Sequence, residues 1–323
     1  MASTSDSTVF VLGAGFSVAE GFPLIRGLRD RVVHFLEAER NSAYTAWLEP
    51  CGEFPEGQFY AGLRTIDQTS SLEFEELLIT LSKRRQENRR GDPCFQTDVA
   101  LRIGCARLLW CLQNAIWQVS ECYRNFAGWL RSDGSDAIVC FNWDLLVEKM
   151  LVDAGHSWAY AGAGPGIPVL KPHGSINWSG HLRERLSAPY PHWQPLGPGS
   201  SLCFDRREPL SNPNKQEVNS DLRYMIFPGD PDLPGRDTDV RWLWEQAERA
   251  ISDRDSLVFI GYSLPDYDRF AADFFRRFAG RKSLAAYTPS AEHLIRYREV
   301  FGPSAVLRQE RFDECVYATS PPP

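Results

Sequence analysis

Short apolar segments that lack polar alternation recur along the chain, and each is bounded by turn residues. Several of them lead into segments with helical spacing. Strands that are buried on both faces show this pattern, which is typical of a parallel sheet. We therefore expect an α/β fold with a Rossmann-like parallel sheet. The predicted strands are residues 9–12, 137–141, 168–170, 224–227, 257–260 and 284–287.

The long stretch between the first two strands has helical spacing instead. Three tryptophans in it, Trp110, Trp117 and Trp129, could stack on a cofactor, but an aromatic residue at this spacing more often belongs to a core. We predict a helical insertion over residues 31–130. Its two apolar faces are Phe74, Leu77, Leu78 and Leu81 on one helix and Leu101, Cys105, Leu108, Leu112, Ile116 and Val119 on another.

The same pattern suggests how the chain is divided. Residues 1–30 and 131–319 are expected to form the sheet domain around the insertion. Residues 179–223 are rich in Pro, Gly and Ser, which predicts a long loop or a small hairpin over the pocket. Residues 320–323 are expected to be a disordered tail.

Composition agrees with a globular enzyme and excludes several partners. With 323 residues, 43% of them hydrophobic, the chain can bury a large core. Its net charge of -7 argues against direct nucleic-acid binding. The eight cysteines contain no CxxC pair, so we expect no metal site. No apolar run is long enough to span a bilayer, which predicts a soluble, cytoplasmic protein without a membrane partner.

The first predicted strand ends in the motif Gly13-Ala14-Gly15-Phe16-Ser17. Two glycines one residue apart let the backbone turn sharply and approach a ligand, and a helix starting there would direct N–H groups at a pyrophosphate. Val18 takes the place of the third glycine of the dinucleotide fingerprint, and no acidic residue ends a strand about twenty residues later. An ordinary dehydrogenase is therefore not expected.

Three more polar segments follow predicted strands, where an open α/β sheet binds its ligands. Asn142 and Asp144 alternate with aromatic residues, although they could simply turn the chain and cap a helix predicted at 145–152. His173 lies on a Pro-His-Gly turn and could be catalytic or structural. Gly261 and Ser263 could approach a phosphate, but such turns are common without a ligand.

In their order along the chain, Gly-Ala-Gly-Phe-Ser, Phe-Asn-Trp-Asp, His-Gly-Ser and Gly-Tyr-Ser-Leu resemble the sirtuin (SIR2) superfamily. The similarity is to the zinc-free, SIR2-like NADase domains of bacterial anti-phage defence proteins. It covers the sheet-forming half of the chain and implies a sirtuin-like, or DHS-like, Rossmann fold that binds NAD.

The resemblance also implies roles for individual residues. Asn142 would position the attacking water or a ribose hydroxyl, Asp144 would hold the nicotinamide carboxamide, and His173 would be the general base. The residues implied to surround the rest of NAD are Gly13, Ala14, Gly15, Ser17 and Arg26 at the pyrophosphate and the nicotinamide ribose, Gly261 and Ser263 at the adenosine-side phosphate and ribose, and Thr288 near the adenosine.

Departures from the family pattern restrict the reaction. The four zinc cysteines of protein-deacylating sirtuins are absent, since only Cys203 lies in that interval. Leu24-Ile25 replaces the Asp-Phe pair that precedes the family arginine. Pro228 lies in the segment where deacylases pair with a substrate peptide, and proline cannot donate a ladder hydrogen bond.

We therefore expect an NAD+ glycohydrolase that uses NAD as substrate, without a metal, and depletes it in response to phage. The alternatives are an NAD-dependent deacylase, an ADP-ribosyltransferase, or a non-catalytic module that senses NAD or ADP-ribose. Because a constitutively active NADase would kill its host, we also expect a homo-oligomer or a complex. The resemblance implies a possible defence partner, such as a HerA-type ATPase or a short Argonaute.

Overall fold

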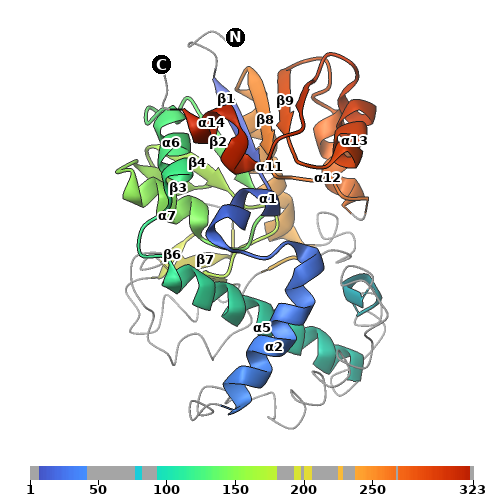
Figure 1. Ribbon diagram of the computed structural model, residues 1–323. Helices are drawn as coiled ribbons and strands as arrows, with labels where there is room; N and C mark the ends of the chain where they lie inside the picture. The colour runs from blue at the N-terminus through green and yellow to red at the C-terminus, as the bar shows by residue number, and fades with distance from the viewer. Residues whose placement is uncertain are drawn as a thin grey trace.

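Seven parallel strands form the central sheet of the computed structural model, in the order β10-β9-β8-β1-β2-β4-β3 (Figure 1). The structure describes residues 7–41, 77–81, 93–179, 193–197, 200–205, 225–227, 237–266 and 268–320. The predicted α/β class with a Rossmann-like parallel sheet is confirmed. The strands are β1 (Thr8–Leu12), β2 (Ala137–Cys140), β3 (Trp158–Tyr160), β4 (Ile167–Leu170), β8 (Ser256–Ile260), β9 (Ser283–Tyr287) and β10 (Val306–Arg308).

Strand β1 lies in the middle of the sheet, where β2 and β8 flank it. Val9 pairs with Ala137 on one side and with Leu257 on the other. Because neighbouring strands are parallel, their carboxyl ends meet at one edge of the sheet. The predicted motifs that follow β1, β2, β4 and β8 therefore come together there, although they are far apart in the sequence.

Helices cover both faces of the sheet, and successive side chains of β1 alternate between them. Val9 and Val11 pack in one cluster with residues of α11 (Thr238–Ser252), α12 (Arg269–Arg276) and α13 (Ala291–Phe301). Phe10 and Leu12 pack in the other cluster. The helices on that second face are α6 (Glu121–Trp129), α7 (Leu146–Asp153) and α14 (Val316–Thr319), and the 3-10 helix η3 (Phe312–Glu314) adds Phe312 to the same cluster.

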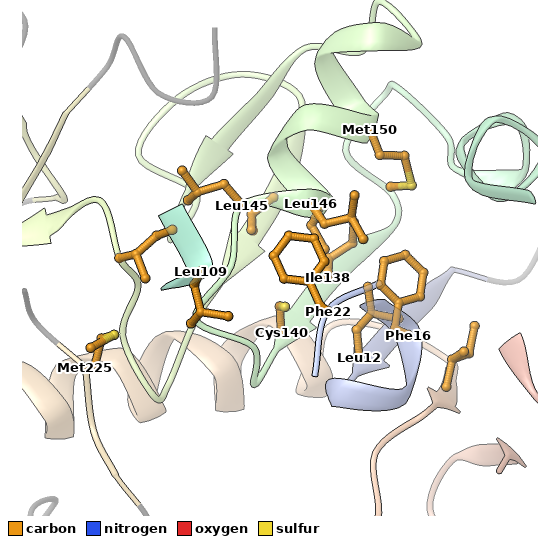
Figure 2. Packing of buried hydrophobic residues seen from close by; sticks show 14 of the residues in the cluster. Leu12, Phe16, Phe22, Leu109, Ile138, Cys140, Leu145, Leu146, Met150 and Met225 are labelled. Atoms are coloured by element: carbon orange, nitrogen blue, oxygen red, sulfur yellow. The ribbon is translucent and has the colours of Figure 1, made fainter. Parts of the chain in front are cut away.

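The glycine motif after β1 folds into the short helix α1 (Ala14–Ser17), followed by the 3-10 helix η1 (Val18–Glu20). Figure 2 shows Phe16 and Phe22 packed beside Leu12 and Ile138, next to the residues of α7. Phe16 is fully buried, which stabilises the fold by about 3 kcal/mol relative to an exposed ring. The buried rings of Phe16 and Phe22 thus hold the glycine turn against the core.

Two long helices, α2 (Ile25–Asn41) and α5 (Pro93–Ala115), pack against each other beyond the carboxyl edge of β1 (Figure 1). Helix α6 falls inside the predicted insertion 31–130, yet it packs on the sheet, where the Phe126 and Phe10 rings lie 5.1 Å apart. Of the predicted face at 74–81, residues 77–81 are helical with three buried leucines, and Phe74 lies outside the described residues.

The helix predicted to continue through Ile116 and Val119 ends earlier, at Ala115. The Ile116 N–H bonds to the Gln113 carbonyl in a tighter turn, which stops the α-helical ladder. The prediction that tryptophans of this region belong to the core is right for Trp110, which is buried, and wrong for Trp117, which is 93% exposed in the turn after α5. Trp129 is half-buried.

The strand predicted at 224–227 is also wrong within its described part, 225–227. Met225 makes an isolated antiparallel bridge to Gly174, outside the main sheet. The physical reason is that β4 is already flanked by β2 and β3, so no edge is left beside it. Tyr224 lies outside the described residues.

The predicted loop or hairpin at 179–223 contains, in its described part, a small antiparallel sheet in the order β5-β7-β6. Its strands are β5 (Trp178–Ser179), β6 (Trp193–Pro195) and β7 (Cys203–Asp205). The tail predicted at 320–323 is described only at Ser320. Among the residues that the structure describes, no helix has the length and apolar character needed to cross a membrane.

Candidate functional site

At the carboxyl edge of the sheet, two glycine turns of the protein pack directly on each other. The Gly15 N–H donates to the Gly261 carbonyl at 2.9 Å. A Cβ on Gly13 would lie 2.5 Å from the Cα of Tyr262, and a Cβ on Gly261 would overlap the Phe16 nitrogen. Gly261 also has φ +63°, in the left-handed region that favours glycine. The sequence predicted that the glycines let the backbone approach a ligand. In the structure, the glycine turn after β1 instead approaches the glycine turn after β8.

Asn142, in the loop after β2, links that loop to the glycine motif. Its Nδ2 donates to the Gly13 carbonyl and to the Ser17 hydroxyl, both at 2.9 Å. A carbonyl can only accept, so the amide NH2 must face Gly13 and the amide oxygen must point the other way. That oxygen, Oδ1, makes no hydrogen bond within the described part of the chain. Asn142 therefore presents an acceptor at the sheet edge.

Asp144 is buried two residues further on. Its Oδ1 accepts the N–H of Leu146, the first residue of α7, at 3.1 Å. Burial raises the pKa of the Asp144 carboxyl, while Lys171 and the Ser17 hydroxyl act in the opposite direction. The sequence left open that Asn142 and Asp144 cap the helix that follows. Asp144 does bond to the first residue of α7, whereas the side chain of Asn142 bonds to the glycine motif.

Behind this loop lies a buried ion pair that sequence reasoning missed. Lys171 follows β4, and its Nζ lies 3.0 Å from Glu148 Oε1 of α7, with both side chains fully excluded from solvent. The same Nζ donates to the backbone oxygen of Asp144. The Tyr160 hydroxyl donates to Glu148 Oε1 at 2.7 Å. These contacts fix the loop after β2 to the end of β4. The only signal in the sequence is a lysine directly after an apolar strand.

His173 follows on the turn after β4, as predicted. Gly174, with φ +77°, closes the turn through its N–H to the Lys171 carbonyl. Trp143 Nε1 donates to the His173 carbonyl at 3.1 Å, and the Phe141 ring meets the imidazole edge-on at 4.8 Å. Asn142 thus lies between two aromatic residues that both contact His173.

The imidazole of His173 has a partner that sequence reasoning also missed. His173 Nε2 lies 3.2 Å from Asp268 Oδ2. Asp268 is the N-cap of α12, where its Oδ1 accepts the Ala271 N–H, and its Oδ2 accepts the Tyr262 hydroxyl. Burial alone would raise the pKa of Asp268, but His173 and these two donors outweigh burial, and the pKa lies below its usual range.

Two further predicted residues, Thr288 and Arg26, lie in a second group around His293. Thr288 is buried, with Oγ1 3.2 Å from His293 Nδ1. Burial lowers the pKa of His293, and the charges of Arg296 and Arg26 lower it further, which puts Arg26 within electrostatic reach. Arg26 itself is exposed on the first turn of α2.

Ser263 lies between the two groups, in the loop after β8. Its side chain is half-buried, and its hydroxyl has no bonded partner in the described ranges. The loop is fixed by Tyr297 of α13, whose hydroxyl donates to the Tyr262 carbonyl at 2.8 Å. Arg296 of the same helix pairs with Asp266 at 3.1 Å. The loop therefore connects the His173 group to the His293 group.

The structure thus brings Gly13, Ser17 and Asn142 into one hydrogen-bonded set, with Asp144 and His173 beside it. Thr288 contacts His293, whose pKa the charge of Arg26 also lowers. Counted over the described residues alone, no three His, Cys, Asp or Glu side chains gather as a metal site. A surface hollow of about 370 Å³ lies at the carboxyl ends of β9 and β10, next to Thr288, whose N–H donates to the Arg308 carbonyl at 3.2 Å. It is lined by Tyr287, Arg308, Glu310, Glu314, Val316 and Thr319.

Comparisons with known proteins leave the family open. No family profile matches the sequence, and no curated protein matches it. A solved structure described as a Sir2 homolog–NAD complex is similar over 96% of this chain and 86% of that chain, with 13% identity and a TM-score of 0.45. That degree of similarity does not assign the chain to a family. Fold and site together define an α/β protein with a polar cluster at the carboxyl edge of a Rossmann-like sheet.

Proposed function

We propose that this chain is an NAD+ glycohydrolase, which cleaves NAD+ to nicotinamide and ADP-ribose. The sequence motifs that resemble the SIR2 superfamily suggest the substrate. One observation carries the chemistry. Asn142 is held by its NH2 to Gly13 and Ser17, presents its oxygen, and lies between two aromatic residues that contact His173.

The reaction breaks the bond between ribose C1′ and the nicotinamide nitrogen, through an oxocarbenium-like state. The electron pair of that bond leaves with nicotinamide, and a water oxygen bonds to C1′. In the proposal, Asn142 Oδ1 accepts one hydrogen of that water, and His173 takes the proton that the water loses. Held together, these groups replace an encounter in solution with a fixed geometry, which accelerates the step.

Asp144 and Arg26 would bind the nicotinamide carboxamide and the pyrophosphate of the substrate. A carboxylate can accept about four hydrogen bonds, so Asp144 retains capacity for the carboxamide N–H of nicotinamide beyond its contacts with Leu146 and Ser17. Arg26 is exposed and has no ion-pair partner among the residues described, so its charge is available to a pyrophosphate. In the proposal Gly261, Ser263 and Thr288 line the adenosine side.

The decisive experiment measures nicotinamide release from NAD+ by the purified chain, at several protein concentrations and with or without a chelator. We expect release without added metal, together with free ADP-ribose. Transfer of labelled ADP-ribose to protein would instead identify a transferase. NAD+ binding without nicotinamide release in every assembly tested would overturn the proposal and favour a sensor.

We propose in addition that assembly controls the activity, because a constitutively active chain would deplete the NAD of its own host. A homo-oligomer, or a defence partner such as a HerA-type ATPase or a short Argonaute, would supply that control during phage infection. The fully exposed ring of Trp117 is a natural first position to test at an interface. Light scattering combined with turnover tests this. A strictly monomeric, fully active protein would contradict it.

A further inference from the structure

We propose that Asp268 is a positioning residue for His173: its carboxylate holds the Nε2–H tautomer and leaves Nδ1 as the nitrogen that accepts a proton. The use of Nδ1 as a base rests on the proposed function, whereas the tautomer rests on the geometry of this chain alone. Sequence motifs assign no role to Asp268.

The first support is the way the Asp268 carboxylate is bound. Its Oδ1 accepts the Ala271 N–H at 3.2 Å, and its Oδ2 accepts the Tyr262 hydroxyl at 2.9 Å and faces His173 Nε2 at 3.2 Å. An ionised carboxylate can only accept hydrogen bonds, so the hydrogen between Asp268 and His173 must belong to Nε2. His173 Nδ1 has no hydrogen-bond partner among the residues that the structure describes.

The second support is that the imidazole cannot easily turn away. Phe141 meets it edge-on at 4.8 Å and is itself stacked on Tyr262, with ring centroids 4.3 Å apart and an interplanar angle of 16°. Trp244 of α11 lies on another side, at 6.3 Å. Packing therefore limits the ring to the orientation in which Nε2 faces Asp268.

The charged neighbours of His173 are few. Phe141 and Trp244, which reach it from the loop after β2 and from α11, do not titrate. Tyr262, after β8, offers a neutral hydroxyl that is bonded to Asp268. Lys171, on the same turn as His173, directs its Nζ to Glu148 and the Asp144 carbonyl. Within the described ranges, Asp268 is thus the ionised group in contact with the imidazole.

This arrangement gives a balanced proton path. When the water oxygen bonds to C1′ and nicotinamide leaves with its bonding pair, the released proton moves to His173 Nδ1. The resulting imidazolium keeps its Nε2–H on Asp268, whose negative charge stabilises it. The proton then passes from Nδ1 to solvent, and Asp268 stays ionised throughout.

Asp268→Asn is a sharp test because the side chain at position 268 caps α12, and this role fixes which way the asparagine amide must point. The backbone N–H of Ala271 requires an acceptor, so the amide oxygen must face α12 and the NH2 must face His173 Nε2. Asparagine is also a good N-cap, so the helix should remain folded. The NH2 would make Nε2 an acceptor and shift the proton to Nδ1. Asp273→Asn, on the exposed face of α12, is the matched control.

The first measurement is independent of NAD. Nitrogen-15 shifts of the histidine rings, with His173 assigned from a His173→Gln variant, report which nitrogen carries hydrogen. We expect the Nε2–H form in the wild type and in Asp273→Asn, and the Nδ1–H form in Asp268→Asn. The same tautomer in the wild type and in Asp268→Asn would overturn the proposal.

The second measurement is turnover. We expect Asp268→Asn to lower kcat about a hundredfold or more and to change KM less than about threefold, because the base is no longer positioned while the contacts with substrate remain. Asp273→Asn should behave as the wild type. An unchanged kcat in Asp268→Asn would overturn the positioning role and leave the glycohydrolase intact. A wild type that shows the expected tautomer and never releases nicotinamide would overturn the proposed function, and the Asp268–His173 pairing would stand.

Discussion

Lys171 Nζ and Glu148 Oε1 lie 3.0 Å apart in a part of the protein that excludes solvent completely from both side chains. Removing two charges from water is costly, and their attraction offsets this only when the geometry is good and the remaining polar atoms are bonded. Here the ammonium also binds the Asp144 carbonyl, and the Tyr160 hydroxyl binds Glu148 Oε1. The second carboxylate oxygen, Glu148 Oε2, is buried without a hydrogen-bond partner among the described residues. The pair therefore couples the His173 turn to the loop that carries Asn142.

Breaking the pair from one side should be worse than removing both charges. Lys171→Met leaves the Glu148 carboxylate buried without its cation, and we expect a loss of about 3–5 kcal/mol in the free energy of unfolding. In Lys171→Met/Glu148→Gln, both charges of the pair are removed and Tyr160 keeps an acceptor, so the loss should be smaller than in the single variant. Urea unfolding of Lys171→Met, Glu148→Gln and the double variant measures the three losses. A loss in the double variant equal to the sum of the single losses would contradict the coupling.

Asn142 should matter more for the reaction than for binding. We expect Asn142→Ala and His173→Ala to lower nicotinamide release about a hundredfold or more, because each removes a group placed at the reacting atoms. NAD affinity, measured by calorimetry, should change little. Asn125→Ala is the control, since Asn125 Nδ2 makes a similar bond, at 2.8 Å, to the Ala318 carbonyl away from the site. Wild-type release by folded Asn142→Ala would refute the assignment.

The central strands were predictable because their residues pack on both faces of the sheet. In β1 and β8, nearly every side chain is apolar and buried, so nearly every residue indicates a buried strand. Strand β10, at the sheet edge, is largely exposed and includes Arg308, and it resembles a loop in sequence. Residues 225–227 are apolar because they pack beside the His173 turn, which no local pattern distinguishes from a sheet strand.

The site was predictable only where a motif marks it. Asn142 and His173 follow strands in recognisable short segments, and the structure brings those segments together. Asp268 precedes a helix and has the sequence signal of an N-cap, which it is. Its contact with His173 comes from the packing of two loops distant in the sequence, and no spacing rule reports such a contact.

Ionisation of Asp144 should lower stability at neutral pH. Burial raises its native pKa above the ordinary value of 3.8, so the native state binds the proton more tightly than the unfolded chain. The protonated Asp144 carboxyl therefore adds its full contribution to the free energy of unfolding below pH 3.8, and this contribution is lost as the pH rises through the native pKa. We expect the Tm of Asp144→Asn, relative to wild type, to rise as the pH increases above 3.8, and the turnover of the variant to be lower than that of the wild type. A relative Tm that falls over this range would contradict the burial argument.

The contact between the two glycine turns should be intolerant of a single methyl group. In Gly261→Ala, the Cβ would overlap the backbone of Gly15 and Phe16, and alanine would have to adopt φ +63°. We expect a loss of roughly 3 kcal/mol or more in the free energy of unfolding, together with loss of NAD turnover.

Gly280→Ala separates the effect of the steric overlap from the effect of the positive φ. Gly280 has φ +70° with nothing within 4 Å of an added Cβ, so only the backbone cost of about 1 kcal/mol should appear. Equal losses in the two variants, measured by urea unfolding, would mean that the turns do not need to approach so closely, and that the glycine motif is free to serve a ligand instead.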